Sequence, residues 1–227
     1  MYTLIANFKQ NKTIDESIDW LKNVDFKKLR SSSNVRIVVA PAHPLLYPMK
    51  VYIQENLKEL YNTRLFLGAQ DISMFDSGSH TGDVGIDQLK DLVDYVIVGH
   101  LERRQRFDDE FVVNNKLKLA IKGGFTPIVC FSDFEEFEFT EIKAESILFS
   151  FEPRLSVGTG NTASVEEIAS VIAGTQLKTM LYGGSVDLYA ISKFVKIEGL
   201  KGFLIGTNSL VPRDFEDIMN ELVDRVG

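Results

Sequence analysis

Short apolar runs recur along the chain and alternate with longer segments in which apolar residues lie three and four positions apart. Runs of this kind indicate buried parallel strands, and the three-and-four spacing indicates amphipathic helices. We expect eight strands, at Thr3–Phe8, Val35–Ala40, Leu65–Gln70, Tyr95–Gly99, Pro127–Phe131, Ile147–Phe151, Met180–Tyr182 and Phe203–Gly206. Most neighbouring runs are about thirty residues apart, the size of one βα unit.

Helical spacing is clearest in three segments, Ile14–Leu29, Leu45–Tyr61 and Phe215–Val226. Strand followed by helix, eight times in 227 residues, predicts an α/β fold with one (β/α)8 barrel. No linker or Pro-rich boundary divides the chain, so we expect residues 1–227 to form a single domain. A doubly wound open sheet is the alternative, but it usually has fewer strands and a Gly-rich turn after the first one.

The fifth unit is short, because the segment between Phe131 and Ile147 has little room for a full helix and two loops. We expect a stunted helix or an irregular loop there, in a segment rich in Phe and Glu.

Composition excludes several classes of function. The net charge of −7 and the lack of a basic run argue against a nucleic-acid partner. No apolar run approaches the roughly 20 residues of a membrane span, so we expect no membrane insertion and no signal peptide. Cys130 is the one cysteine, which precludes an intrachain disulfide and fits a cytoplasmic location.

Chemistry-bearing residues follow the predicted strands, at the end where barrels carry their active sites. Asn7 and Lys9 follow the first strand, His100 the fourth and Glu152 the sixth. A carboxylate between an aromatic residue and a proline suits a general base, and a lysine supplies a cation for an anionic substrate. Each residue also has a structural alternative: a lysine at a loop start, a histidine before a charged helix, a glutamate capping a loop.

Glycines gather in the turns after the last three strands, around Gly158, Gly183 and Gly206. Glycine lets backbone N–H groups approach an anion closely, and barrel loops after strands seven and eight often bind phosphate. Together with a base, an imidazole and a lysine, these turns indicate proton abstraction beside the carbonyl of a phosphorylated compound, through an enediolate. We expect no cofactor and no metal, because nucleotide-binding fingerprints and metal-ligand spacings are lacking.

The motifs and their order resemble those of the triosephosphate isomerase family. The matching segments are Asn7–Asn11, Gly68–Gln70, Val98–Arg104, Phe151–Pro153, Gly158–Gly160, Tyr182–Val186 and Gly202–Gly206. They span nearly the whole chain. The resemblance implies a TIM barrel that interconverts dihydroxyacetone phosphate and D-glyceraldehyde 3-phosphate, in glycolysis and gluconeogenesis.

The resemblance also implies a role for each residue. Glu152 would move the proton between two substrate carbons, and His100, as a neutral imidazole, would polarise the carbonyl. Lys9 would offset the negative charge, with Asn7 donating a hydrogen bond beside it and Glu102 pairing with the lysine.

Phosphate would be bound by the backbone N–H groups of Gly158, Ser185, Gly206 and Thr207, and residues 153–163 would form a lid.

In relatives, the loop matching Gly78–Asp83 enters a partner subunit, and the residue matching Thr81 supports the partner's active site. The resemblance therefore implies a homodimer, with His80 at the interface. The short fifth unit is similar to that of archaeal relatives, some of which are tetramers, so a tetramer is the alternative.

Four further residues receive structural roles. We interpret His43 as a loop residue, Cys130 as a buried structural residue, and Arg103 and Arg104 as salt-bridge residues.

The chain also departs from the family pattern. Leu101 stands where the family has a serine that holds the catalytic carboxylate, and a leucine side chain cannot do so. Arg154 and Leu155 replace Val-Trp in the lid, and Thr207 replaces a glycine. The departures at Leu101 and at Arg154 and Leu155 motivate a second hypothesis, a barrel that has lost catalysis and acts as a phosphate-binding or scaffold protein. A different phosphosugar enzyme on the same barrel is the third.

Overall fold

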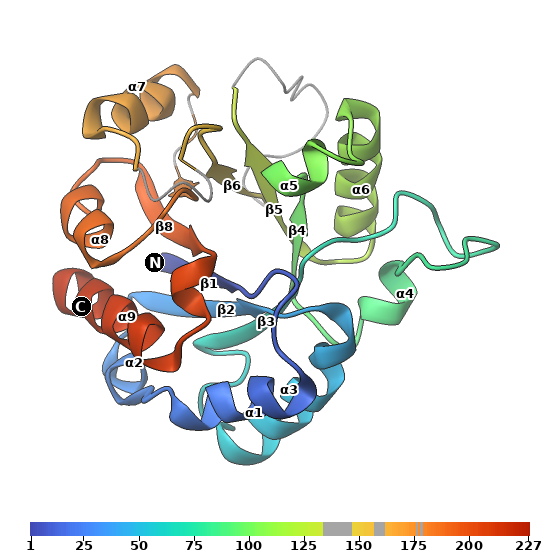
Figure 1. Ribbon diagram of the computed structural model, residues 1–227, viewed down its shortest axis with the longest axis horizontal. Coiled ribbons are helices and arrows are strands. Elements are labelled where there is room, and N and C mark those ends of the chain that lie inside the picture. Colours follow the sequence, from blue (N-terminus) through green and yellow to red (C-terminus); the bar gives the residue numbers. More distant parts are fainter. Residues whose placement is uncertain (134–146, 157–161, 176, 178) are drawn as a thin grey trace.

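Eight strands form a closed parallel barrel in the computed structural model, which describes residues 1–133, 147–156, 162–175, 177 and 179–227 (Figure 1). The strands are β1 (Tyr2–Asn7), β2 (Val35–Ala40), β3 (Leu65–Ala69), β4 (Tyr95–Val98), β5 (Thr126–Phe131), β6 (Leu148–Phe151), β7 (Met180–Tyr182) and β8 (Leu200–Ile205). Each strand pairs with the next in sequence, and β8 pairs with β1 to close the ring. The predicted barrel is confirmed.

Helices surround the ring of strands (Figure 1). They are α1 (Ile14–Asn23), α2 (Lys27–Ser31), α3 (His43–Asn56), α4 (Ile86–Leu89), α5 (Leu101–Arg104), α6 (Glu110–Lys122), α7 (Val165–Thr175), α8 (Leu188–Phe194) and α9 (Pro212–Val226), with a 3-10 turn η3 (Thr207–Ser209). Among the described residues, no helix combines the length and the apolar character needed to cross a bilayer. The segment predicted as a shortened fifth unit falls mostly on residues 134–146, outside the described residues.

The helical segment Ile14–Leu29 contains two helices, because α1 ends where Val24 adopts an extended backbone. Phe26, between the two helices, is buried and packs against Trp20, with ring centroids 6.4 Å apart. His43 is the first residue of α3 and not a loop residue, since a proline in the first turn of a helix supports its start.

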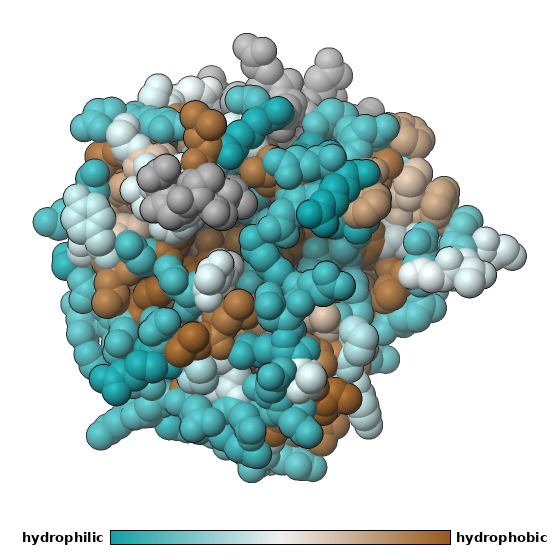
Figure 2. All heavy atoms as spheres, in the orientation of Figure 1, coloured by the Kyte–Doolittle hydropathy of each residue, from teal (hydrophilic) through white to brown (hydrophobic). Residues whose placement is uncertain are grey.

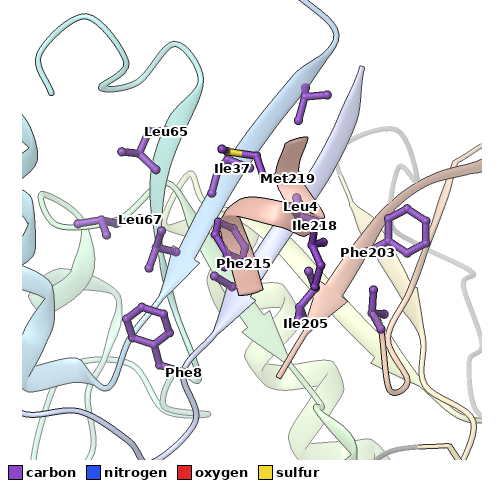
Figure 3. Packing of buried hydrophobic residues seen from close by; sticks show 14 of the residues in the cluster. Leu4, Phe8, Ile37, Leu65, Leu67, Phe203, Ile205, Phe215, Ile218 and Met219 are labelled. Carbon is purple, nitrogen blue, oxygen red and sulfur yellow. The ribbon is translucent and has the colours of Figure 1, made fainter. Parts of the chain in front are cut away.

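The barrel has an inner and an outer core, because alternate residues of a strand face opposite sides. Ile5 and Leu204 point into the ring, whereas their neighbours Leu4 and Phe203 face the helices. Figure 3 shows Leu4 and Ile205 of the outer face close to Ile218 of α9. Fully burying one such side chain is worth about 1.5–3 kcal/mol. The strand patterns that predict the barrel therefore also stabilise it.

Closure of the ring depends on Gly202, which lies opposite Thr3 in the β8–β1 pair. A Cβ atom at Gly202 would lie 2.0 Å from the carbonyl oxygen of Thr3. Because backbone atoms cannot yield as a flexible side chain can, only glycine fits here without moving one strand away from the other.

We therefore expect Gly202→Ala to lower the free energy of unfolding by about 1–3 kcal/mol or more, as overpacking does. Urea unfolding followed by circular dichroism measures this. Gly174→Ala in α7 is the matched control: among the described residues, a Cβ atom there would meet nothing within 4 Å beyond its own helix turn. The change should be neutral or stabilise by up to about 1 kcal/mol. Equal midpoints for the two variants would contradict the closure argument.

Candidate active site

The parallel barrel brings the carboxyl ends of its strands to one mouth, and most of the sequence-predicted site residues lie there. Asn7 ends β1, His100 begins the turn into α5, and Glu152 directly follows β6. Ser185 follows β7, and Gly206 follows β8. Gly158 and part of the predicted lid lie outside the described residues.

Glu152 is 1% exposed, and hydrogen bonds hold both its carboxylate and its main chain. Its Oε2 accepts a hydrogen bond of 3.0 Å from the backbone N–H of Leu101. The hydroxyl of Ser132 donates to its carbonyl oxygen at 2.8 Å. The contact at Leu101 uses the backbone and not the side chain. A leucine therefore does not leave the carboxylate without a donor, although it lacks the hydroxyl of the family's serine.

His100 faces Glu152, with Nε2 of the imidazole 3.5 Å from Oε1 of the carboxylate. The ring caps α5, because its Nδ1 accepts a 3.2 Å hydrogen bond from the backbone N–H of Glu102. A nitrogen that accepts cannot carry a proton, so in this geometry the imidazole is neutral and its proton is on Nε2. The N–H of His100 is therefore on the side of the ring that faces Glu152.

Lys9 has a left-handed backbone, with φ of 51°, which is uncommon for a residue with a side chain. Its N–H donates to Oδ1 of Asn7 at 3.0 Å, and its Nζ lies 2.6 Å from Oε1 of Glu102. Burial raises the pKa of Glu102, whereas the hydrogen bond and the charge of Lys9 lower it, and the resulting pKa lies below its usual value. The lysine and the glutamate therefore form a charged pair near neutral pH.

The lysine side chain passes over Gly206, since a Cβ there would lie 3.0 Å from Cε of Lys9. Glycine at this position lets the cation and the turn after β8 approach each other. Thr207, the next residue, does not have a positive φ. The turn therefore accommodates its β-branched side chain without left-handed strain.

Ser185 also has a left-handed backbone, with φ of 45°. Its hydroxyl donates to the carbonyl oxygen of Ser156 at 2.6 Å, which connects the turn after β7 to the segment after β6. Non-glycine residues in this region of φ cluster at functional sites.

A cleft of about 620 Å³ adjoins these residues and extends to the side away from Glu152. Its lining includes Asn7, Lys9, His100, Glu102, Arg106, Phe107 and parts of the segment between β3 and α4. The cleft thus shares four site residues but is not itself centred on the facing carboxylate and imidazole.

A buried charge network in this cleft escaped the sequence analysis. Lys116, 3% exposed, lies 2.6 Å from Asp71 and 2.9 Å from Asp108, and Arg103 lies 2.9 Å from Asp71. Burial raises the pKa of Asp71 although Lys116 and Arg103 oppose it. The sequence holds one indication of this network. Lys116 is three residues after Val113, so both lie on the same, buried face of α6.

The structural roles predicted for three other residues agree with their surroundings. Arg103 pairs with Asp71, and Arg104 pairs with Glu110. Cys130 is fully buried inside the barrel, where desolvation and the nearby Glu152 carboxylate raise the pKa of its thiol well above the usual value. A thiol in that state is a poor nucleophile.

Comparison with known proteins shows which family the chain resembles over nearly its whole length. The family model described as triosephosphate isomerase matches residues 2–222. The triosephosphate isomerase of Alkaliphilus oremlandii is 32% identical, over 96% of this chain and 98% of its own length. Those of Mycoplasma pneumoniae and Mycoplasmopsis pulmonis are 31% and 32% identical, over 93% and 95% of this chain and 95% and 96% of their own lengths. The chain belongs to the triosephosphate isomerase family.

Proposed function

We propose that this chain interconverts dihydroxyacetone phosphate and D-glyceraldehyde 3-phosphate, as an isomerase of glycolysis and gluconeogenesis. The observation that carries the proposal is the buried carboxylate of Glu152 beside the neutral imidazole of His100, 3.5 Å apart. A base and an N–H donor on one side of a small site match the needs of a proton transfer between adjacent carbons.

In the forward direction, Glu152 removes a proton from the hydroxymethyl carbon of the ketone, and the electron pair forms the carbon–carbon double bond of an enediolate. The Nε2–H of His100 donates to the carbonyl oxygen, on which negative charge develops. His100 passes its Nε2 proton to that oxygen and takes up the proton of the neighbouring hydroxyl. Glu152 then returns its proton to the former carbonyl carbon, and the aldehyde forms. The reaction needs no oxidant, reductant or cofactor, because two protons change position and the substrate's overall oxidation state stays the same.

Lys9 offsets the charge of the enediolate and of the phosphate, and Glu102 holds the ammonium group through their 2.6 Å contact. Asn7 supports the left-handed turn by accepting the N–H of Lys9. We assign phosphate binding to the N–H groups of Ser185, Gly206 and Thr207, together with Gly158.

The alternative of a binding or scaffold barrel has no observation in its favour among the described residues. Of the departures that motivated it, Leu101 still supplies a donor to Glu152 through its backbone N–H, and Arg154 lies 3.4 Å from Asp133 in an ion pair. A cytoplasmic location stays a prediction from the single cysteine.

Glu152→Asp tests the base. The shorter side chain withdraws the carboxylate by one methylene, and a misplacement of about 1 Å can cost roughly a hundredfold in rate. A coupled assay on D-glyceraldehyde 3-phosphate should show kcat lowered by about a hundredfold or more. The dissociation constant of 2-phosphoglycolate should stay within about threefold, since phosphate binding is elsewhere.

Glu198→Asp is the control, because Glu198 is exposed and precedes β8 at the opposite end of the barrel. It should leave both quantities unchanged. A normal rate in Glu152→Asp would overturn the assignment of the base, and a wild type that binds 2-phosphoglycolate without turnover would favour the scaffold hypothesis.

We also propose that the chain forms a homodimer in which the loop Gly78–Asp83 enters the partner's cleft. These residues are exposed, and the segment between β3 and α4 extends away from the barrel at the right of Figure 1. In Figure 2 the projection is mostly teal or white, and the cleft that it would enter is lined in part by charged side chains such as Lys9 and Glu102. Phe75 stacks on His80, with centroids 4.2 Å apart, and gives the projection its own packing.

Thr81→Arg tests this dimer. A long arginine side chain entering a cleft whose cations and carboxylates are already paired, as Lys116 is with Asp71 and Asp108, would meet steric repulsion. Light scattering should give twice the 25.6 kDa chain mass for the wild type and one chain mass for the variant. Thr63→Arg, at the opposite end of the barrel, should remain dimeric. A monomeric wild type, or a Thr81→Arg variant of unchanged mass, would contradict the proposal, and four chain masses would favour the tetramer.

A further inference from the structure

The turn after β8, residues 206–210, is fastened to the neighbouring β1 side by several side chains. Trp20 donates from its indole nitrogen to the carbonyl oxygen of Ser209 at 2.8 Å. The hydroxyl of Ser209 donates to the carbonyl oxygen of Gly206 at 2.7 Å and lies 3.4 Å from that of Asn7. Lys12 donates to the carbonyl oxygen of Leu210 at 2.7 Å. These contacts fix the turn relative to β1 and α1.

Asn208 makes a contact in the opposite direction. Its side-chain amide donates to the carbonyl oxygen of Val186 at 2.7 Å, which joins the turn after β8 to the turn after β7. Val186 is 3% exposed and directly follows the left-handed Ser185. The bond therefore acts on the segment that orients the backbone of Ser185.

Backbone pairing does not extend to these two turns. The register between β7 and β8 includes an irregularity and reaches Tyr182 and Phe203, before either turn begins. Beyond that point the relative position of the turns depends on contacts such as the one that Asn208 makes. The side-chain amide of Asn208 is suited to this linking role, because its NH2 group donates hydrogen bonds and its side chain has a fixed length.

We propose that Asn208 is a positioning residue that sets the spacing between the Ser185 turn and the Gly206 turn, and thereby the affinity for the phosphate end of the substrate. The inference rests on the proposed function, which assigns phosphate to these turns. Asn208 need not touch the substrate. Its amide fixes two sets of backbone donors at the separation that one phosphate group can bridge.

Asn208→Ala removes the link. Loss of one hydrogen bond between two turns predicts a roughly three- to tenfold rise in the dissociation constants of 2-phosphoglycolate and inorganic phosphate, measured by calorimetry. The KM for D-glyceraldehyde 3-phosphate should rise with them. Exchange of the carbon-bound proton of unphosphorylated D-glyceraldehyde in D2O should be unchanged, because that substrate does not use the phosphate site.

Asn208→Asp keeps the shape of the side chain but cannot donate to the Val186 carbonyl, and it adds a negative charge near the anion. It should bind both ligands more weakly than Asn208→Ala. Asn34→Ala is the matched control, because Asn34 makes an equivalent 2.7 Å bond to the carbonyl oxygen of Val226 and precedes β2 at the opposite end of the barrel. It should leave affinity unchanged.

Equal affinities for Asn208→Ala and Asn34→Ala would overturn the inference, and so would an equal loss of activity on phosphorylated and unphosphorylated substrates. A wild type that binds phosphate but does not isomerise would overturn the proposed function alone, and the calorimetric comparison would still decide the role of Asn208. A wild type that binds neither phosphate ligand would overturn both.

Discussion

A buried carboxylate is the constraint on which the site depends. Glu152 is 1% exposed, and an ionised group in that position is costly unless donors compensate it. The N–H of Leu101 donates to the carboxylate at 3.0 Å, and Nε2 of His100 lies 3.5 Å from it. Both groups follow β4, whereas the carboxylate follows β6, so they meet only if the barrel closes in the right register. Stability and chemistry thus require the same geometry.

The two halves of the barrel mouth have different chemistry. Between β1 and β4 lie side-chain charges, with Lys9 and Glu102 paired and the Asp71–Lys116 network behind them. At β7 and β8 the turns are glycine-bearing and hold their shape through hydrogen bonds to carbonyl oxygens. Gly183 shows why side chains are small there, since a Cβ would lie 3.1 Å from Oε1 of Glu152. A cationic side and a side of main-chain donors suit a small substrate that ends in an anion.

Much of this was predictable from the sequence, because burial on both faces makes each strand a continuous apolar run. Strand ends then identified Lys9, His100 and Glu152. Other features give weaker signals. Strand β8 begins at Leu200 and not at the predicted Phe203. The prediction starts late because Lys201 and Gly202 interrupt the apolar pattern.

Main-chain donors carry no sequence signal at all, so the N–H of Leu101 could not be predicted from its side chain. Long-range pairs such as Asp71 with Lys116, or Asn208 with Val186, depend on which strands become neighbours. They become visible only once the ring has closed.

Isotope exchange measures most directly whether the Glu152 carboxylate carries the substrate proton. With dihydroxyacetone phosphate in D2O, the wild type should place deuterium on the carbon next to the carbonyl, as a base that exchanges with solvent does. Glu152→Gln, which keeps the shape and an oxygen for the Leu101 N–H, should slow that exchange by about a thousandfold, within the range of general-base catalysis. Exchange in Glu152→Gln at the wild-type rate would contradict this role of Glu152.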